Sequence, residues 1–135
     1  LPVGTGDEGY RRAMARAVEP VVDAFRPGLI VVACGQDASQ FDPNGRMCVS
    51  MNGFRDLGAA ARAMADRHCD GRLVLVQEGG YGRTYSGLCM HATLEGVLGT
   101  GPLLEDPMTY LPDDVDRADA AVEAVQAAMA PYWTI

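Results

Sequence analysis

Hydrophobic positions along the chain follow two patterns. In four stretches apolar residues recur every three or four positions, which is typical of amphipathic helices. These stretches are residues 6–26, 52–69, 84–98 and 113–130. Two short runs, 29–34 and 73–76, are instead continuously apolar and rich in β-branched residues, which predicts strands buried on both faces. The predicted order is therefore helix, strand, helix, strand, helix, helix.

Two buried strands joined through a helix predict a parallel pair with a right-handed crossover, and hence an α/β fold. A parallel sheet needs cover on both faces and further strands at its edges, which this chain does not supply. We therefore expect residues 1–135 to form the C-terminal portion of one larger α/β domain. The expected partner is the N-terminal portion of the same protein or a complementary chain, and homo-oligomer formation stays open.

Composition and charge narrow the class of protein. The chain has 135 residues, of which 48% are hydrophobic, as expected for one globular domain. Its 11 basic residues are all arginine and face 18 acidic ones, so a net charge of −7 argues against nucleic acid or an anionic membrane as partner. Four cysteines without a CxxC pair indicate free thiols and a reducing, cytoplasmic location.

Polar residues gather where each predicted strand ends, in loops 35–43 and 77–82. The carboxyl ends of parallel strands meet at one edge of a sheet, where functional crevices form, so both loops are expected to share one rim. Asp37 or Asp42 could hold a cation there, or could instead cap a turn or the following helix. Tyr81, between glycines, could reach an oxyanion or could simply fill a surface turn.

The glycine-rich stretch 77–87 also raises the possibility of phosphate binding. Gly80 and Gly82 are followed by Tyr85 where a dinucleotide-binding motif needs glycine, and no Lys-Ser or Lys-Thr pair follows as in a P-loop. A nucleotide site is therefore disfavoured, and an α/β module that binds a small anion stays as a minor alternative.

Several segments together resemble the zinc-dependent histone deacetylase superfamily, most closely the bacterial class II histone-deacetylase-like amidohydrolases, some of which act on acetylpolyamines. The matching segments are LPVGTGDEGY (1–10), FRPGLIVVACGQDA (25–38), DPNGRM (42–47), GFRDL (53–57) and GRLVLVQEGGY (71–81). The resemblance covers residues 1–98, and the loop and helix over 99–135 are similar in a looser way. It implies the three-layer α/β/α fold of arginases and deacetylases, here incomplete.

The resemblance also implies roles for individual residues. Asp37 would be one of three protein ligands to a catalytic Zn²⁺, and Tyr81 would donate a hydrogen bond to the developing oxyanion. Gly79 and Gly80 would line the substrate tunnel with backbone atoms, and Asn44 would face that tunnel. Asp42 would order its loop without touching the metal.

The remaining zinc ligands and the general base lie upstream of these segments in the family, so this chain is expected to be inactive alone. His68 and His91, inside predicted helices, are expected to be structural or solvated rather than ligands. The predicted function is zinc-dependent removal of an acyl group, such as acetyl, from a small acylated amine. The family usually has an aromatic residue at the position of Gln36, and Leu or Met at the position of Asn44. Because of these departures, acetyl-lysine, polyamine and other acyl substrates all stay possible. A non-catalytic regulatory subunit is a further alternative.

Overall fold

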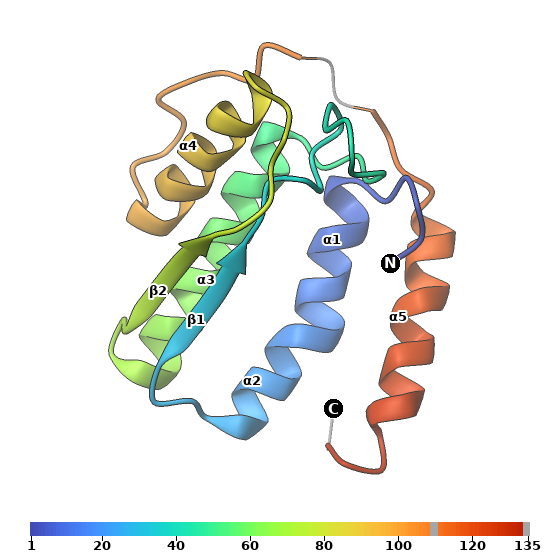
Figure 1. Ribbon diagram of the computed structural model, residues 1–135. Coiled ribbons are helices and arrows are strands. Elements are labelled where there is room, and N and C mark those ends of the chain that lie inside the picture. Colours follow the sequence, from blue (N-terminus) through green and yellow to red (C-terminus); the bar gives the residue numbers. More distant parts are fainter. Residues whose placement is uncertain (109–110, 134–135) are drawn as a thin grey trace.

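The computed structural model describes residues 1–108 and 111–133, with the predicted order of elements (Figure 1). The elements are α1 (Asp7–Ala13), a π-helical segment η1 (Met14–Val18), α2 (Glu19–Phe25), β1 (Ile30–Cys34), α3 (Met51–Cys69), β2 (Leu73–Gln77), α4 (Tyr85–Leu98) and α5 (Val115–Met129). Helices α3, α4 and α5 and both strands begin and end within two residues of the predicted positions.

The two strands pair in parallel, as predicted. The register runs from Ile30 opposite Leu73 to Cys34 opposite Gln77, and no third strand joins them in the described part of the chain. Helix α3 lies against one face of this sheet, and α4 packs against α3 (Figure 1). The chain thus supplies a sheet and one helical layer of an α/β fold.

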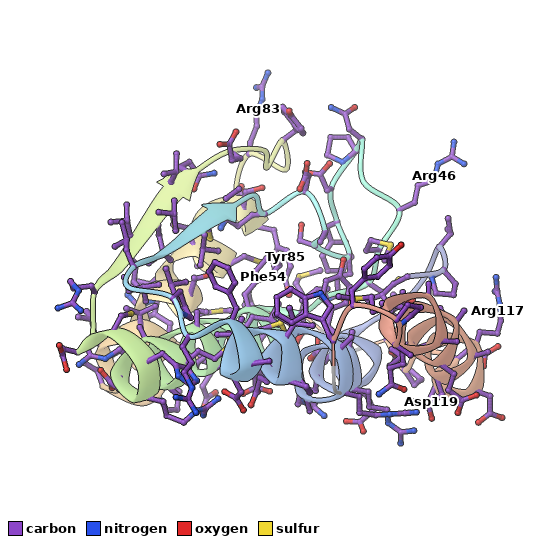
Figure 2. All side chains as sticks on the ribbon, turned by 90° about the horizontal axis from the view of Figure 1, so that it is seen from below. Arg46, Phe54, Arg83, Tyr85, Arg117 and Asp119 are labelled. Atoms are coloured by element: carbon purple, nitrogen blue, oxygen red, sulfur yellow. The ribbon has the colours of Figure 1, made fainter. Side chains whose placement is uncertain are left out.

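The other face of the sheet is bare, and the prediction of strands buried on both faces is wrong for this chain. Val31 is 59% exposed, and Val74 and Val76 are 45% and 44% exposed. Figure 2 shows all helices on one side of the two strands, which leaves the other side uncovered. Burying a valine side chain stabilises a fold by about 1.5 to 3 kcal/mol, so this face leaves substantial apolar burial unused.

The core lies between the helices and the loop that follows β1. It consists of Val49, Met51, Phe54, Tyr85, Cys89 and Ala92. In Figure 2, Phe54 and Tyr85 lie between the helices and the strand and loop layer. The Tyr85 hydroxyl donates to Asp106 Oδ2 at 2.7 Å and accepts from the Met51 N–H at 3.0 Å. The core therefore supports the loops at the carboxyl ends of the strands.

The first predicted helix, 6–26, is interrupted by the π-helical segment η1, which the periodicity did not predict. Pro20 has no N–H to donate to the Arg16 carbonyl, and its ring would clash with that carbonyl in a regular helix. Gln126 Nε2, from α5, donates to the Arg16 carbonyl at 2.8 Å instead. The irregular turn is therefore stabilised from outside the helix.

Helix α5 packs along α1 (Figure 1). Ala118 and Val122 are buried in this contact, whereas Val125, which continues the same apolar spacing, is exposed. Asp113 Oδ2 accepts from the N–H groups of Gly6 and Gly9 at 3.0 and 2.8 Å, so it caps the start of α1.

The structure also shows the surroundings of the cysteines and histidines. All four cysteines are free, and three of them are buried. His68 Nε2 lies 2.6 Å from Asp23 Oδ1, and His91 Nδ1 lies 3.2 Å from Glu95 Oε1, so both histidines make contacts within the fold. Among the described residues, no helix combines the length and apolar character needed to cross a membrane.

Candidate active site at the carboxyl ends of the strands

The loops that follow the two strands remain in contact beyond the strand ends. The Glu78 N–H donates to the Cys34 carbonyl at 3.2 Å, and the Gln36 N–H donates to the Gly79 carbonyl at 2.8 Å. These bonds continue the ladder of the parallel pair by one step on each side. The two loops thus share one rim, as predicted, with Asp37 beside Gly79.

Asp37 lies in a space that only glycines leave open. A Cβ at position 79 would lie 2.3 Å from Asp37 Oδ2, and one at position 35 would lie 2.9 Å from Oδ1. On the other side of the residue, a Cβ at position 45 would lie 1.7 Å from the Asp37 carbonyl oxygen. The absence of side chains at three glycines therefore leaves the space that Asp37 occupies.

Within the described part of the chain, no hydrogen bond or ion pair is formed by the Asp37 carboxylate. Asp37 acts electrostatically on Tyr10: burial and then the negative charge of Asp37 raise the pKa of the Tyr10 phenol. A carboxylate without a donor is open to a cation, because a charged group is unfavourable near apolar surface unless it is paired.

A cavity of about 300 Å³ opens beside Asp37. It lies between β1 and the helices, and its lining includes Tyr10, Val32, Gly35 and Phe54. Tyr81 does not line this cavity. Convergence of the Asp37 carboxylate and the Tyr81 phenol on one cavity therefore stays a prediction.

Asp42 has the opposite environment. Its Oδ1 accepts from the N–H groups of Asn44 and Gly45, both at 2.8 Å. Its Oδ2 accepts from the N–H groups of Tyr81 and Gly82, at 2.6 and 3.3 Å. One carboxylate therefore joins the two loops and fixes the backbone of Tyr81.

The segment that carries Tyr81 has a conformation that needs glycine. Gly80 has φ = +132°, a value that residues with a side chain rarely adopt. Tyr81 itself is 56% exposed, and Asn44 is exposed on the neighbouring loop. The structure thus places Gly79, Gly80, Tyr81 and Asn44 around the rim, with Tyr81 held through its backbone.

The donor set for a metal is incomplete in this chain. No group of three or more His, Cys, Asp or Glu side chains that could hold a metal occurs among residues 1–108 and 111–133. A catalytic Zn²⁺ has about three protein ligands and one open position. The unpaired Asp37 carboxylate fits the place of one oxygen ligand, and the other ligands would have to come from outside this chain.

Comparison with known proteins assigns the family. The histone deacetylase domain model matches residues 1–97, and the chain therefore belongs to the histone deacetylase family. Over 127 residues it is 50% identical to histone deacetylase 8 of Arabidopsis thaliana, covering 93% of this chain and 34% of that protein. It is also 44% identical over 105 residues to a histone deacetylase-like amidohydrolase of Pseudomonas aeruginosa, covering 78% of this chain and 28% of that protein.

Solved structures agree with this assignment. The chain superimposes on the histone deacetylase Clr3 with a TM-score of 0.80 at 28% identity, covering 98% of this chain and 21% of that one. The predicted deacetylase-like α/β fold is confirmed. The chain spans about a third or less of the length of these relatives.

Two contacts at the rim were not predicted. Tyr10 is one, because the charge of Asp37 adds to burial in raising the pKa of its phenol. Ser86 is the other, because its Oγ would be 3.3 Å from a Cβ at Gly80. Tyr10 belongs to a segment that carried the family resemblance, which could have marked it. For Ser86 the sequence held no signal, because its importance comes from contacts made by the folded loop.

Proposed function

We propose that this chain forms part of the active site of a zinc-dependent amidohydrolase. The enzyme would remove an acyl group such as acetyl from an amine such as acetyl-lysine or an acetylated polyamine. The observation that carries this proposal is the Asp37 carboxylate, which has no partner among the described residues and lies beside Gly79 at the strand ends. Membership of the histone deacetylase family supports it.

In this proposal Asp37 is one of the ligands of Zn²⁺. Zinc, when bound, polarises the acyl carbonyl and lowers the pKa of a bound water. The other ligands and the general base come from the N-terminal portion of the enzyme or from a complementary chain. The exposed valines of the sheet, Val31, Val74 and Val76, support such a partner, because they present an apolar face next to the rim.

The remaining rim residues bind and orient the substrate. The Tyr81 hydroxyl donates a hydrogen bond to the oxygen of the acyl carbonyl as negative charge develops there. Gly79 and Gly80 leave room for a narrow tunnel, and Asn44 contributes an uncharged polar wall. Asp42 holds the Tyr81 backbone, so that this part of the loop does not have to be ordered when the substrate binds.

The test is Tyr81→Phe in the complete protein that contains this chain. We expect kcat on an acetylated lysine substrate to fall by about 10² to 10³-fold, because one oxyanion donor is lost, while zinc content is unchanged. Tyr132→Phe is the matched control, since Tyr132 is 80% exposed and follows α5, far along the chain from the rim. A Tyr81→Phe enzyme with full activity would exclude the proposed role.

A second candidate is a non-catalytic, regulatory member of the family. Gln36, at a position where the resembling family has an aromatic residue, is fully buried beside Asp37, and this departure favours the candidate. Turnover of an acetylated fluorogenic lysine or polyamine by the complete protein, inhibited by a hydroxamate, would exclude it.

A further inference from the structure

Two polar residues, Gln36 and Ser86, lie close to Gly80 in the loop that carries Tyr81. A Cβ at position 80 would lie 3.1 Å from the Cβ of Gln36 and 3.3 Å from the Oγ of Ser86. Gln36 belongs to the loop after β1 and Ser86 to the first turn of α4. The positive φ of Gly80 and the absence of a side chain there let the loop approach both groups.

Gln36 is completely buried, yet its amide is poorly paired. Nε2 lies 3.2 Å from Cys34 Sγ and 3.8 Å from Met90 Sδ, and sulfur atoms are weak acceptors. Oε1 is buried and has no hydrogen-bond partner among the described residues. If the amide oxygen and nitrogen were exchanged, the Cys34 thiol could donate to the oxygen, but the NH₂ group would then be unpaired in the same place.

Ser86 also has a buried polar atom without a hydrogen-bond partner among the described residues. Its backbone N–H donates to the Gly82 carbonyl at 2.9 Å, which closes the turn that directly follows Tyr81. Its Oγ is buried without a partner in the part of the chain that the structure describes. A Cβ at Gly82 would lie 3.5 Å from this oxygen, so the hydroxyl is inside the turn.

A buried polar group without a hydrogen bond is unfavourable, so two such groups beside one glycine point to a shared partner. Buried waters typically bind unsatisfied polar groups and make about two to four hydrogen bonds. The Gln36 amide and the Ser86 hydroxyl can each donate or accept, which suits a water between them.

We propose that Gln36 and Ser86 bind one ordered water beneath Gly80 and thereby act as positioning residues for Tyr81. The water joins the loop after β1 to the start of α4 and supports the segment from Gly80 to Gly82. Asp42 holds the same segment through the N–H groups of Tyr81 and Gly82. The effect on catalysis rests on the oxyanion role of Tyr81 proposed above, whereas the water and the loop order do not.

The test uses Gln36→Met and Ser86→Ala in the complete protein. Each removes the polar group with little change in volume, and we expect kcat to fall about tenfold with KM nearly unchanged, because the phenol is less well placed. In a Tyr81→Phe background the same two changes should have no further effect on kcat. Thr5→Val is the control: Thr5 is a buried residue in the N-terminal segment, and this change removes a hydroxyl that bonds to the Pro2 carbonyl.

Two readouts do not depend on activity. Backbone amides in 79–83 should exchange with solvent about tenfold faster in both variants than in the wild type and in Thr5→Val. A high-resolution crystal structure should show a water within hydrogen-bonding distance of Gln36 and Ser86 together. An empty space there, or unchanged amide exchange in both variants, would overturn the proposal.

The activity results separate this inference from the proposed function. If Tyr81→Phe is inactive but Gln36→Met and Ser86→Ala keep the full kcat, the positioning role is wrong and the proposed function stands. The positioning role is also wrong if both changes reduce kcat equally in the Tyr81→Phe background. If Tyr81→Phe keeps full activity, the proposed function fails, and amide exchange and the crystal structure still decide whether the water supports the loop.

Discussion

Asp37 and Asp42 are chemically identical side chains five positions apart on one loop, and the fold treats them in opposite ways. Asp42 accepts four backbone hydrogen bonds from two loops. The Asp37 carboxylate accepts none from the described residues and is bordered by glycines. A carboxylate whose oxygens are already paired contributes to structure, whereas one left unpaired at a crevice is available to a cation or substrate.

The largest effect on zinc binding is expected from changes at Asp37, and they test the contrast between the two aspartates most directly. We expect Asp37→Asn in the complete protein to weaken zinc binding by at least about 100-fold, because a charged ligand is lost. The free energy of unfolding of the zinc-free protein should change by less than about 1 kcal/mol, since no described residue is bonded to this carboxylate. Zinc titration and denaturant unfolding measure the two quantities. A large loss of stability without a change in zinc affinity would reverse the roles assigned to the two aspartates.

Gly79→Ala tests whether the space around Asp37 matters. The new Cβ would lie 2.3 Å from Asp37 Oδ2, so the carboxylate must move, and zinc should bind about 10- to 100-fold more weakly. Gly87→Ala is the matched control, because a Cβ there meets no atom within 4 Å. In helix α4 this control should raise the free energy of unfolding by about 0.5 to 1 kcal/mol and leave zinc affinity unchanged. Equal zinc affinities in both variants would contradict the prediction.

Changes at Asp42 should act on stability first. Asp42→Ala leaves four N–H groups without their acceptor, and we expect the free energy of unfolding to fall by about 2 to 4 kcal/mol. Asp42→Asn should cost less, because the amide oxygen can still accept from one of the two loops. Denaturant unfolding of the zinc-free protein provides the measurement. Wild-type stability in Asp42→Ala would show that the carboxylate does not hold the loops together.

The smallest expected effect is the pH dependence of the stability that Asp42 contributes. Burial of Asp42 works against its charged form, but the N–H groups of Tyr81, Gly45, Asn44 and Gly82 outweigh this and lower its pKa below the ordinary 3.8. A carboxyl group with a lowered pKa stabilises the fold above its unfolded-state pKa, and this stabilisation is lost as the pH falls through the folded-state pKa.

The stability difference between the wild type and Asp42→Asn should therefore shrink as the pH falls from about 5 through 3.8 and on toward the lower folded-state pKa. Asp7 has the opposite sign, because burial raises its pKa despite bonds from Ser50, so its protonation favours the fold. This contribution is common to both proteins and cancels in the difference. A difference that stays constant with pH would show that the Asp42 carboxylate is not specifically stabilised in the fold.

Much of the fold was predictable from local patterns. The apolar runs of β1 and β2 and the periodicity of α3, α4 and α5 predicted these elements to within two residues, and the intervening helix predicted the parallel pair. The irregular turn at Met14–Val18 was missed because the apolar spacing looks helical on both sides of it. Pro20 was the only local sign, and a proline near a helix start is also compatible with a regular helix.

The bare face of the sheet shows the limit of such patterns. Val31, Val74 and Val76 have the composition of a doubly buried strand, and a sequence pattern reports what a strand is suited to, not which neighbours this chain supplies. The same holds for Val125, which fits the apolar periodicity of α5 but extends beyond the contact with α1.

The sequence by itself determined the succession of helices and strands, the two loops at the strand ends and, through its motifs, the resemblance to deacetylases. Those features are local, because periodicity and turn residues act over a few positions. Only the tertiary structure decided which aspartate is paired and that Gln36 and Ser86 both lie beside Gly80. The partners of Asp42 at Tyr81 and Gly82 lie 39 and 40 positions away, and they become neighbours only when the parallel strands bring their loops to one edge.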